Sequence, residues 1–98
     1  MLHTVNKSPF QNSALDSCLR FANAGDSILL LEDGVYGAAS GTAKSTLVEG
    51  ALAKKIKVYA LGADLSARAL KETIKGVEIT DYAGFVDLVV ANKIHSWL

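Results

Sequence analysis

The sequence predicts an α/β fold: a single domain over residues 1–98, built as a three-layer sandwich in which a mostly parallel sheet of four to five strands is flanked by helices. Three observations predict it. Strand-like apolar runs alternate with helix-like spacing along the whole chain. Residues 27–31 are continuously hydrophobic, which is typical of a strand buried on both faces. A length of 98 residues suits one core and cannot be divided into two stable halves.

The first half of the chain supplies two strands and two helices. In order, the pattern predicts strand 1–5, helix 15–22, strand 27–31, a helical turn and loop over 34–41, and helix 42–54. The first helix has apolar residues at i, i+3, i+4 and i+7, with Asn12 or Ser13 as N-cap and Gly25 beyond its end. Its lone cysteine therefore lies on the apolar side.

The second half continues the alternation. In order, the pattern predicts strand 56–61, helix 65–75, strand 77–80, helix 82–89 and a short fifth strand over 94–98. Asp64 and Asp81 precede the two helices as N-caps, and Gly76 ends the first of them. In the last helix we expect Tyr82, Phe85, Val86 and Val89 to form one apolar stripe.

Composition narrows the class of protein. Half of the residues are hydrophobic, more than a monomer of this size easily hides, so we expect oligomerisation. Ten basic and ten acidic residues cancel, and we therefore expect contact with RNA only through a partner. The apolar runs are too short for a membrane span and the start does not resemble a signal peptide, which predicts a cytoplasmic protein. One cysteine and two distant histidines predict no metal site and no cofactor.

Cys18 is the only cysteine, and its thiol is a candidate nucleophile. A thiol that is exposed and has a lowered pKa can accept and pass on sulfur. A single cysteine on the apolar stripe of a helix is more often a small buried hydrophobe, and in mid-helix it is far from the helix N-terminus that activates thiols. The core interpretation is favoured, and the persulfide-carrier interpretation stays open.

The acidic turn after the buried strand is the second candidate. Glu32, Asp33 and Gly34 follow directly on strand 27–31, at the sheet edge where α/β proteins bind ligands. Two carboxylates there could serve as an acid and base pair or hold magnesium. Consecutive side chains point apart, however, and an Asp-Gly turn whose carboxylate bonds the backbone explains the pair without catalysis. Tyr36 next to it is a docking aromatic or a lid on the core.

The remaining candidates are weaker. The segment from Gly34 to Thr46 resembles a phosphate loop, but Ala43 stands where that pattern needs a glycine before Lys44, so we reject a nucleotide site. A basic cluster, Lys54, Lys55 and Lys57, is typical of a solvated helix end. His3 is expected to be a satisfied core histidine. His95 and Trp97 alternate as in an edge strand or a subunit contact, which makes Trp97 a candidate interface residue.

Four segments in order give a family resemblance over essentially the whole chain. They are MLHTVNKSPF at the start, GDSILLLEDGVYGA, IKVYALGADLSARAL, and DYAGFVDLV with the residues from Ile94 onward. Together they resemble the DsrH/TusB family, and the resemblance implies the DsrEFH-like fold. It also implies a small cytoplasmic subunit of a sulfur-relay complex, in which related B-, C- and D-type chains form a heterohexamer. A downstream carrier then delivers the sulfur for 2-thiolation of the tRNA wobble uridine.

The resemblance assigns the principal reactive cysteine to the D-type partner. Cys18 matches a position where some DsrH-type members carry a cysteine and many TusB-type members do not. Glu32, Asp33, Tyr36 and Trp97 are expected to serve the fold or a subunit interface. We therefore expect an accessory, non-catalytic subunit. The alternatives are a DsrH-type subunit of a sulfur-oxidation relay with Cys18 as persulfide carrier, and a homo-oligomeric protein-binding module; homo-oligomers are also expected when the chain is expressed alone.

Overall fold

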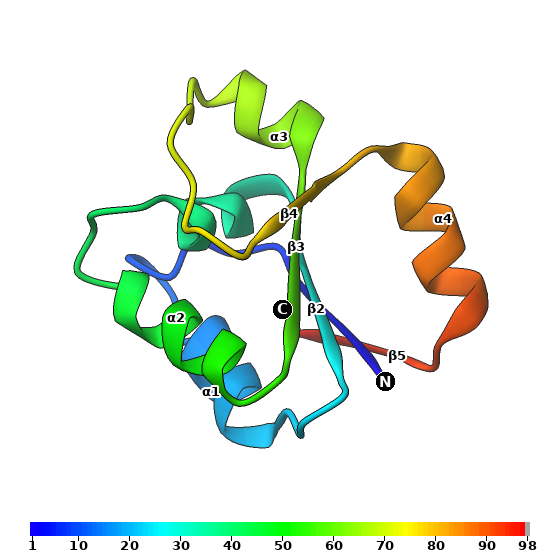
Figure 1. Ribbon diagram of the computed structural model, residues 1–98. Coiled ribbons are helices and arrows are strands. Elements are labelled where there is room, and N and C mark those ends of the chain that lie inside the picture. Colours follow the sequence, from blue (N-terminus) through cyan, green and yellow to red (C-terminus); the bar gives the residue numbers. More distant parts are fainter. Residues whose placement is uncertain (98) are drawn as a thin grey trace.

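The computed structural model describes residues 1–97 (Figure 1). Its elements are β1 (Leu2–Val5), α1 (Ala14–Phe21), β2 (Ser27–Leu30), η1 (Glu32–Ala38, a 3-10 helix), α2 (Ser45–Ala53), β3 (Lys57–Leu61), α3 (Gly62–Ala67), β4 (Glu78–Thr80), α4 (Tyr82–Ala91) and β5 (Ile94–Trp97). Five strands form one sheet in the order β4-β3-β2-β1-β5, and every neighbouring pair is parallel. The predicted fold class is confirmed.

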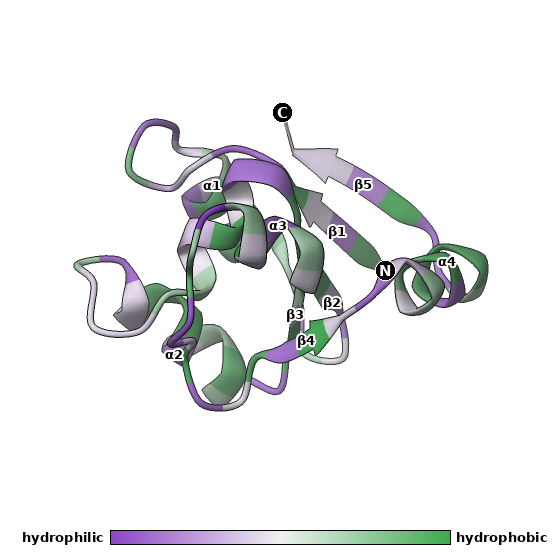
Figure 2. Ribbon diagram, turned by 90° about the horizontal axis from the view of Figure 1, so that it is seen from above, coloured by the Kyte–Doolittle hydropathy of each residue, from purple (hydrophilic) through white to green (hydrophobic). Residues whose placement is uncertain are grey.

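Helices lie on both sides of the sheet. Figures 1 and 2 show α1 and α2 on one side and α4 alone on the other. The chain runs from β1 through β2 and β3 to β4 in one direction, then crosses back through α4 to place β5 on the other side of β1. The direction of winding therefore reverses between β1 and β5, and the carboxyl ends of these two strands form the switch point of the sheet.

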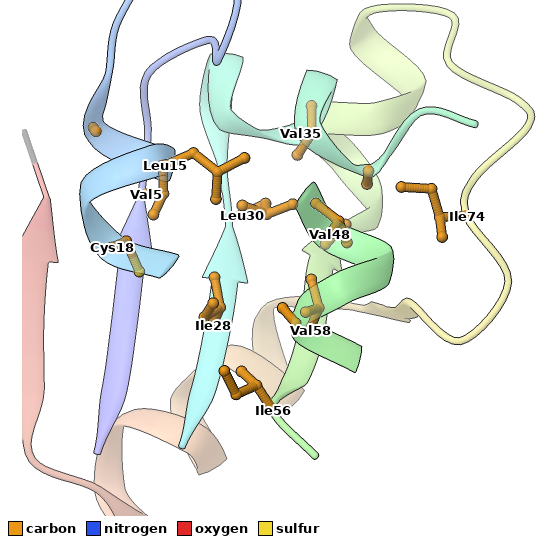
Figure 3. Close-up of a cluster of buried hydrophobic side chains, with 14 of the residues drawn as sticks. Val5, Leu15, Cys18, Ile28, Leu30, Val35, Val48, Ile56, Val58 and Ile74 are labelled. Atoms are coloured by element: carbon orange, nitrogen blue, oxygen red, sulfur yellow. The ribbon is translucent and has the colours of Figure 1, made fainter. Parts of the chain in front are cut away.

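The core lies between the sheet and the side that carries α1, α2 and η1 (Figure 3). The strands contribute alternate residues to it: Val5, Ile28, Leu30, Val58 and Ala60. Leu15 and Val48 come from the two helices and Val35 from η1, and all three are at most 1% exposed. Full burial of a leucine, isoleucine or valine side chain contributes about 1.5–3 kcal/mol, so this cluster dominates the stability of the domain.

Gly34 allows η1 to cross the end of β1. A Cβ atom at this position would overlap the backbone carbonyl oxygen of Val5. Only glycine leaves room for this approach of two backbone segments. The glycine of the acidic turn is therefore explained by packing.

The predicted helix over residues 65–75 is wrong. The helix α3 spans only Gly62–Ala67, and Ala69 has a left-handed backbone with φ of 54°. The following residues run extended across the end of η1, where the N–H of Ile74 donates to the carbonyl of Ala38 over 2.8 Å. Burial of Ile74 in the core outweighs the helical propensity of this stretch. Asp64, expected as the N-cap, lies instead in the first turn of α3.

The other elements differ from prediction only at their ends. The helical turn predicted over 34–41 begins at Glu32, and the helix predicted from residue 42 begins at Ser45 because the Ser45 hydroxyl donates to the carbonyl of Ala39 over 2.9 Å. Asp81 caps α4 as predicted, accepting the Gly84 N–H over 2.8 Å. Of the fifth strand predicted over 94–98, Leu98 lies outside the described residues. No helix of residues 1–97 is long and apolar enough to span a membrane.

Candidate functional site

Cys18 lies in the core, where its side chain is 0% exposed (Figure 3). It projects from α1 toward the sheet, among Val5, Leu15 and Ile28. Burial, and secondarily the negative charge of Asp26, raises the pKa of the thiol to about 12. At pH 7 roughly one thiol in 100,000 is then ionised, and a thiol that is neither ionised nor accessible does not attack a sulfur donor in this conformation.

The acidic turn is held by an arginine that the sequence analysis did not single out. The Arg68 guanidinium donates from Nε to Asp33 Oδ1 over 2.9 Å, and its Nη2 atom lies 2.8 Å from the same oxygen. Asp64 Oδ2 accepts the backbone N–H of Glu32 over 2.7 Å. These contacts join η1 to α3 at the carboxyl edge of the sheet.

This arrangement leaves no acid and base pair at the turn. Asp33 bonds Arg68, rather than the backbone of its own turn as predicted, and the carboxylate that does bond backbone there comes from Asp64. Within residues 1–97, no three histidine, cysteine, aspartate or glutamate side chains lie close enough to share a metal ion. The turn is therefore a structural junction with an exposed Glu32 at its tip.

Tyr36 is half-buried and lies beside this junction. With Asp33 it lines a hollow of about 350 Å³, whose other wall is the loop after β1, with Ser8, Phe10 and Gln11. The ring of Phe10 is 50% exposed there. Three of the four predicted interface residues, Glu32, Asp33 and Tyr36, thus belong to η1, whereas Trp97 lies at the end of β5.

Trp97 forms a hydrogen bond with a side chain of the first strand, β1. Its indole Nε1–H donates to Nδ1 of His3 over 3.1 Å, and Nε2 of His3 lies 3.0 Å from Asp26 Oδ2. An indole N–H can only donate, so Nδ1 of His3 is unprotonated and Nε2 carries the proton that is donated to Asp26. The fully buried His3 is thereby a neutral, satisfied core histidine, as predicted.

Asp26 collects further donors that sequence reasoning missed. Its carboxylate accepts the Asn23 N–H over 3.0 Å and the N-terminal amino group over 3.3 Å. The Asn23 N–H, followed by the bond from His3, lowers the pKa of Asp26 to about 2. An aspartate just before a buried strand is a weak turn signal, and its partners lie 23 and 25 residues away, so spacing alone does not reveal them.

Aromatic rings surround this network. The Trp97 ring centroid lies 4.5 Å from that of His95 and 5.8 Å from that of Phe21. His95 and Phe21 are exposed, and Phe21 forms with Trp97 and Arg20 the wall of a hollow of about 220 Å³. Trp97 therefore fixes the edge strand to β1 while one side of its ring stays accessible.

A hollow of about 770 Å³ lies between α1 and α2. Lys54, from the predicted basic cluster, lines it together with Arg20 and Lys44. Lys44, from the segment that resembles a phosphate loop, has its Nζ atom 3.8 Å from Asp16 Oδ2. Lys55 and Lys57 are exposed outside this hollow.

Comparison with known proteins assigns the family. Residues 7–94 match the family described as "DsrH like protein". Protein TusB of Escherichia coli K12 is 41% identical over 91 residues, which cover 92% of each chain. The chain belongs to the DsrH/TusB family. Protein TusB of Erwinia tasmaniensis is also 41% identical, over 94% of each chain, and that of Pectobacterium parmentieri is 38% identical over 92% of each chain.

Solved structures agree with a DsrH/TusB chain of this fold. The crystal structure of the ychN protein from E. coli superposes with a TM-score of 0.84 over 97% of each chain, at 18% identity. Protein Tm0979 from Thermotoga maritima has a TM-score of 0.65 over 94% of each chain, at 27% identity. The family resemblance and the DsrEFH-like fold that it implied are confirmed.

Proposed function

We propose that this DsrH/TusB chain is an accessory, non-catalytic subunit of a cytoplasmic sulfur-relay complex that acts in 2-thiolation of the tRNA wobble uridine. Family membership supports the relay, since curated relatives named Protein TusB match over more than nine-tenths of the chain. The single observation that supports an accessory role is the burial of Cys18.

The chemistry of sulfur transfer explains why this burial matters. A relay cysteine attacks the outer sulfur of a persulfide as a thiolate and must then present its own persulfide to the next carrier. Both steps need an ionised and accessible sulfur atom. The pKa of Cys18 is raised to about 12 and its side chain is 0% exposed, so we assign the sulfur transfer to a cysteine of a partner chain.

The partners in this proposal are C- and D-type chains, assembled with this chain as a heterohexamer, and a downstream sulfur carrier. The D-type chain holds the reactive cysteine. Because ten acidic and ten basic residues cancel in this chain, tRNA meets the complex indirectly, through the carrier. Glu32, Asp33, Tyr36 and Trp97 are proposed as subunit-contact residues, since all four remain at least partly accessible.

Complementation tests this proposal. The gene is deleted in its host, and wild-type, Cys18→Ala and Cys18→Ser chains are reintroduced while mass spectrometry of tRNA nucleosides measures 2-thiouridine at the wobble position. Deletion should abolish the thiolated nucleoside and both variants should restore it. Failure of variants that still fold and assemble would instead support a persulfide on Cys18, and unchanged thiolation after deletion would support a separate binding module.

A further inference from the structure

Helix α4 is almost wholly apolar and yet none of its residues is buried in the described chain. On its outer side Tyr82, Val86 and Val90 are 62%, 58% and 81% exposed. Ile79 on β4 and Ile94 on β5 flank it and are 61% and 45% exposed. Together these five residues, here named the α4 surface, account for five of the eight large exposed hydrophobic residues of the described chain.

The spacing along α4 explains this exposure. Tyr82, Val86 and Val90 follow at intervals of four, so they lie on one side of the helix. Phe85 and Val89 point the other way and line a groove against the sheet, so the single stripe predicted for Tyr82, Phe85, Val86 and Val89 is wrong. Figure 2 shows α4 standing alone on its side of the sheet, with its apolar residues in green and no second helix beside it. An apolar surface of this kind marks an interaction site.

The groove behind α4 adds a polar feature. It has a volume of about 400 Å³ and opens at the switch point between β1 and β5, with Asn6 among its lining residues. The Asn6 Oδ1 atom is inaccessible and has no hydrogen-bond partner among residues 1–97. Because this oxygen is inaccessible, a partner's side chain does not reach it here, and the choice of partner rests on the charges around the helix.

The charges around the α4 surface decide between a second copy and a different chain. Residues 78–94 carry three carboxylates, Glu78, Asp81 and Asp87, and one cation, Lys93. Asp87 immediately follows Val86 at the centre of the exposed stripe. Three carboxylates and one cation give this region a net charge of −2, and in a two-fold contact between copies the same patch meets itself, so two negative patches face each other. A self-contact is thereby disfavoured.

We propose that the α4 surface docks a different subunit of the complex, one that presents apolar side chains bordered by lysine or arginine, opposite Asp87. This inference rests on the proposed function and goes beyond it, because it adds a contact surface on α4 to the contact residues proposed on η1 and at Trp97. The apolar stripe supplies the burial and the carboxylates select against self-association.

Association measurements test the surface. The chain is co-expressed with tagged C- and D-type chains of the same organism, and recovery with the tag and mass by light scattering are compared for wild type, Val86→Glu and Asp87→Lys. The matched control is Thr46→Glu, which changes an exposed β-branched residue of α2 on the opposite side of the sheet. Circular dichroism confirms that each variant is folded.

Val86→Glu should weaken association at least about tenfold, because it places a charge in the apolar centre of the contact. Asp87→Lys should weaken it and reverse the dependence on salt, and Thr46→Glu should leave it unchanged. Equal recovery of Val86→Glu and wild type, or undiminished binding by Asp87→Lys, would overturn the inference. So would a Val86→Glu variant that loses only self-association, since a second copy then occupies the surface. Absence of any wild-type association contradicts the proposed function itself.

Discussion

The indole of Trp97 donates a hydrogen bond to Nδ1 of His3 over 3.1 Å, which ties the last strand of the described chain to the first across 94 residues. His3 passes this constraint on to Asp26, at the start of β2, through its other ring nitrogen. The hydrogen bonds from Trp97 to His3 and from His3 to Asp26 thus connect three neighbouring strands, β5, β1 and β2. These bonds also fix the tautomer of the buried imidazole.

Removal of the indole donor should destabilise the domain. Trp97→Phe keeps an aromatic ring but leaves Nδ1 of the fully buried His3 without its partner, at a cost of about 1–3 kcal/mol. Urea unfolding followed by circular dichroism measures it. Tyr59→Phe, at a half-buried aromatic of β3, is the control and should change stability by less than about 0.5 kcal/mol. Equal effects of the two substitutions would show that the hydrogen bond contributes nothing.

Asp26 should make the free energy of unfolding decrease as the pH is lowered into the acid range. Because its pKa falls to about 2 in the folded protein from about 3.8 when unfolded, its contribution is complete above about pH 5 and is lost as the pH falls toward 2. Solvent screening limits that contribution to the order of 1 kcal/mol. Asp26→Asn should therefore be less stable than wild type at pH 6 and nearly equal at pH 2, in urea titrations. Glu49→Gln, on an exposed position of α2, should show no such convergence.

The sequence predicted what depends on local pattern. The buried run at Ser27–Leu30, the Asp81 cap and the apolar stripe of α1 follow from spacing and propensity, and each lies where expected. The end of α3 could not be predicted from local pattern, because the burial of Ile74 against η1 is a tertiary effect. Pattern also singled out the candidate residues Cys18, Glu32, Asp33, Tyr36 and Trp97, but it did not predict their contacts: Arg68 and Asp33 lie 35 residues apart, and no spacing rule relates them.

The Arg68 to Asp33 ion pair should contribute modestly to stability. Asp33 is 57% exposed and Arg68 is 21% exposed, so solvent weakens their attraction. A double-mutant cycle with Arg68→Met and Asp33→Asn should give a coupling energy of about 0.5–1 kcal/mol that decreases in 1 M salt. A coupling near zero would show that the ion pair does not help to hold η1 to α3, and that other contacts, such as the Asp64 bond to the Glu32 N–H, do so.

Replacement by alanine should have opposite effects on stability at two glycines, Gly34 and Gly50. Gly34→Ala places a Cβ against the Val5 carbonyl, and because both sides are backbone we expect a loss of more than about 2 kcal/mol. Gly50→Ala, in the middle of α2 with no atom near its would-be Cβ, should gain about 0.5–1 kcal/mol from helix propensity. Thermal unfolding of the two variants measures the contrast. A tolerated Gly34→Ala would contradict the close packing of η1 on β1.

Cys18 should be inert toward thiol reagents in the folded protein. Its sulfur is buried and its pKa is raised to about 12, so alkylation by iodoacetamide requires unfolding or local opening of α1. The rate, followed by mass spectrometry, should rise with urea in parallel with the unfolded fraction. The control is a Cys18→Ala chain that carries Ser13→Cys at an exposed position before α1, which should react at once in native buffer. Rapid native modification of Cys18 would show that α1 opens readily and would restore the thiol as a sulfur carrier.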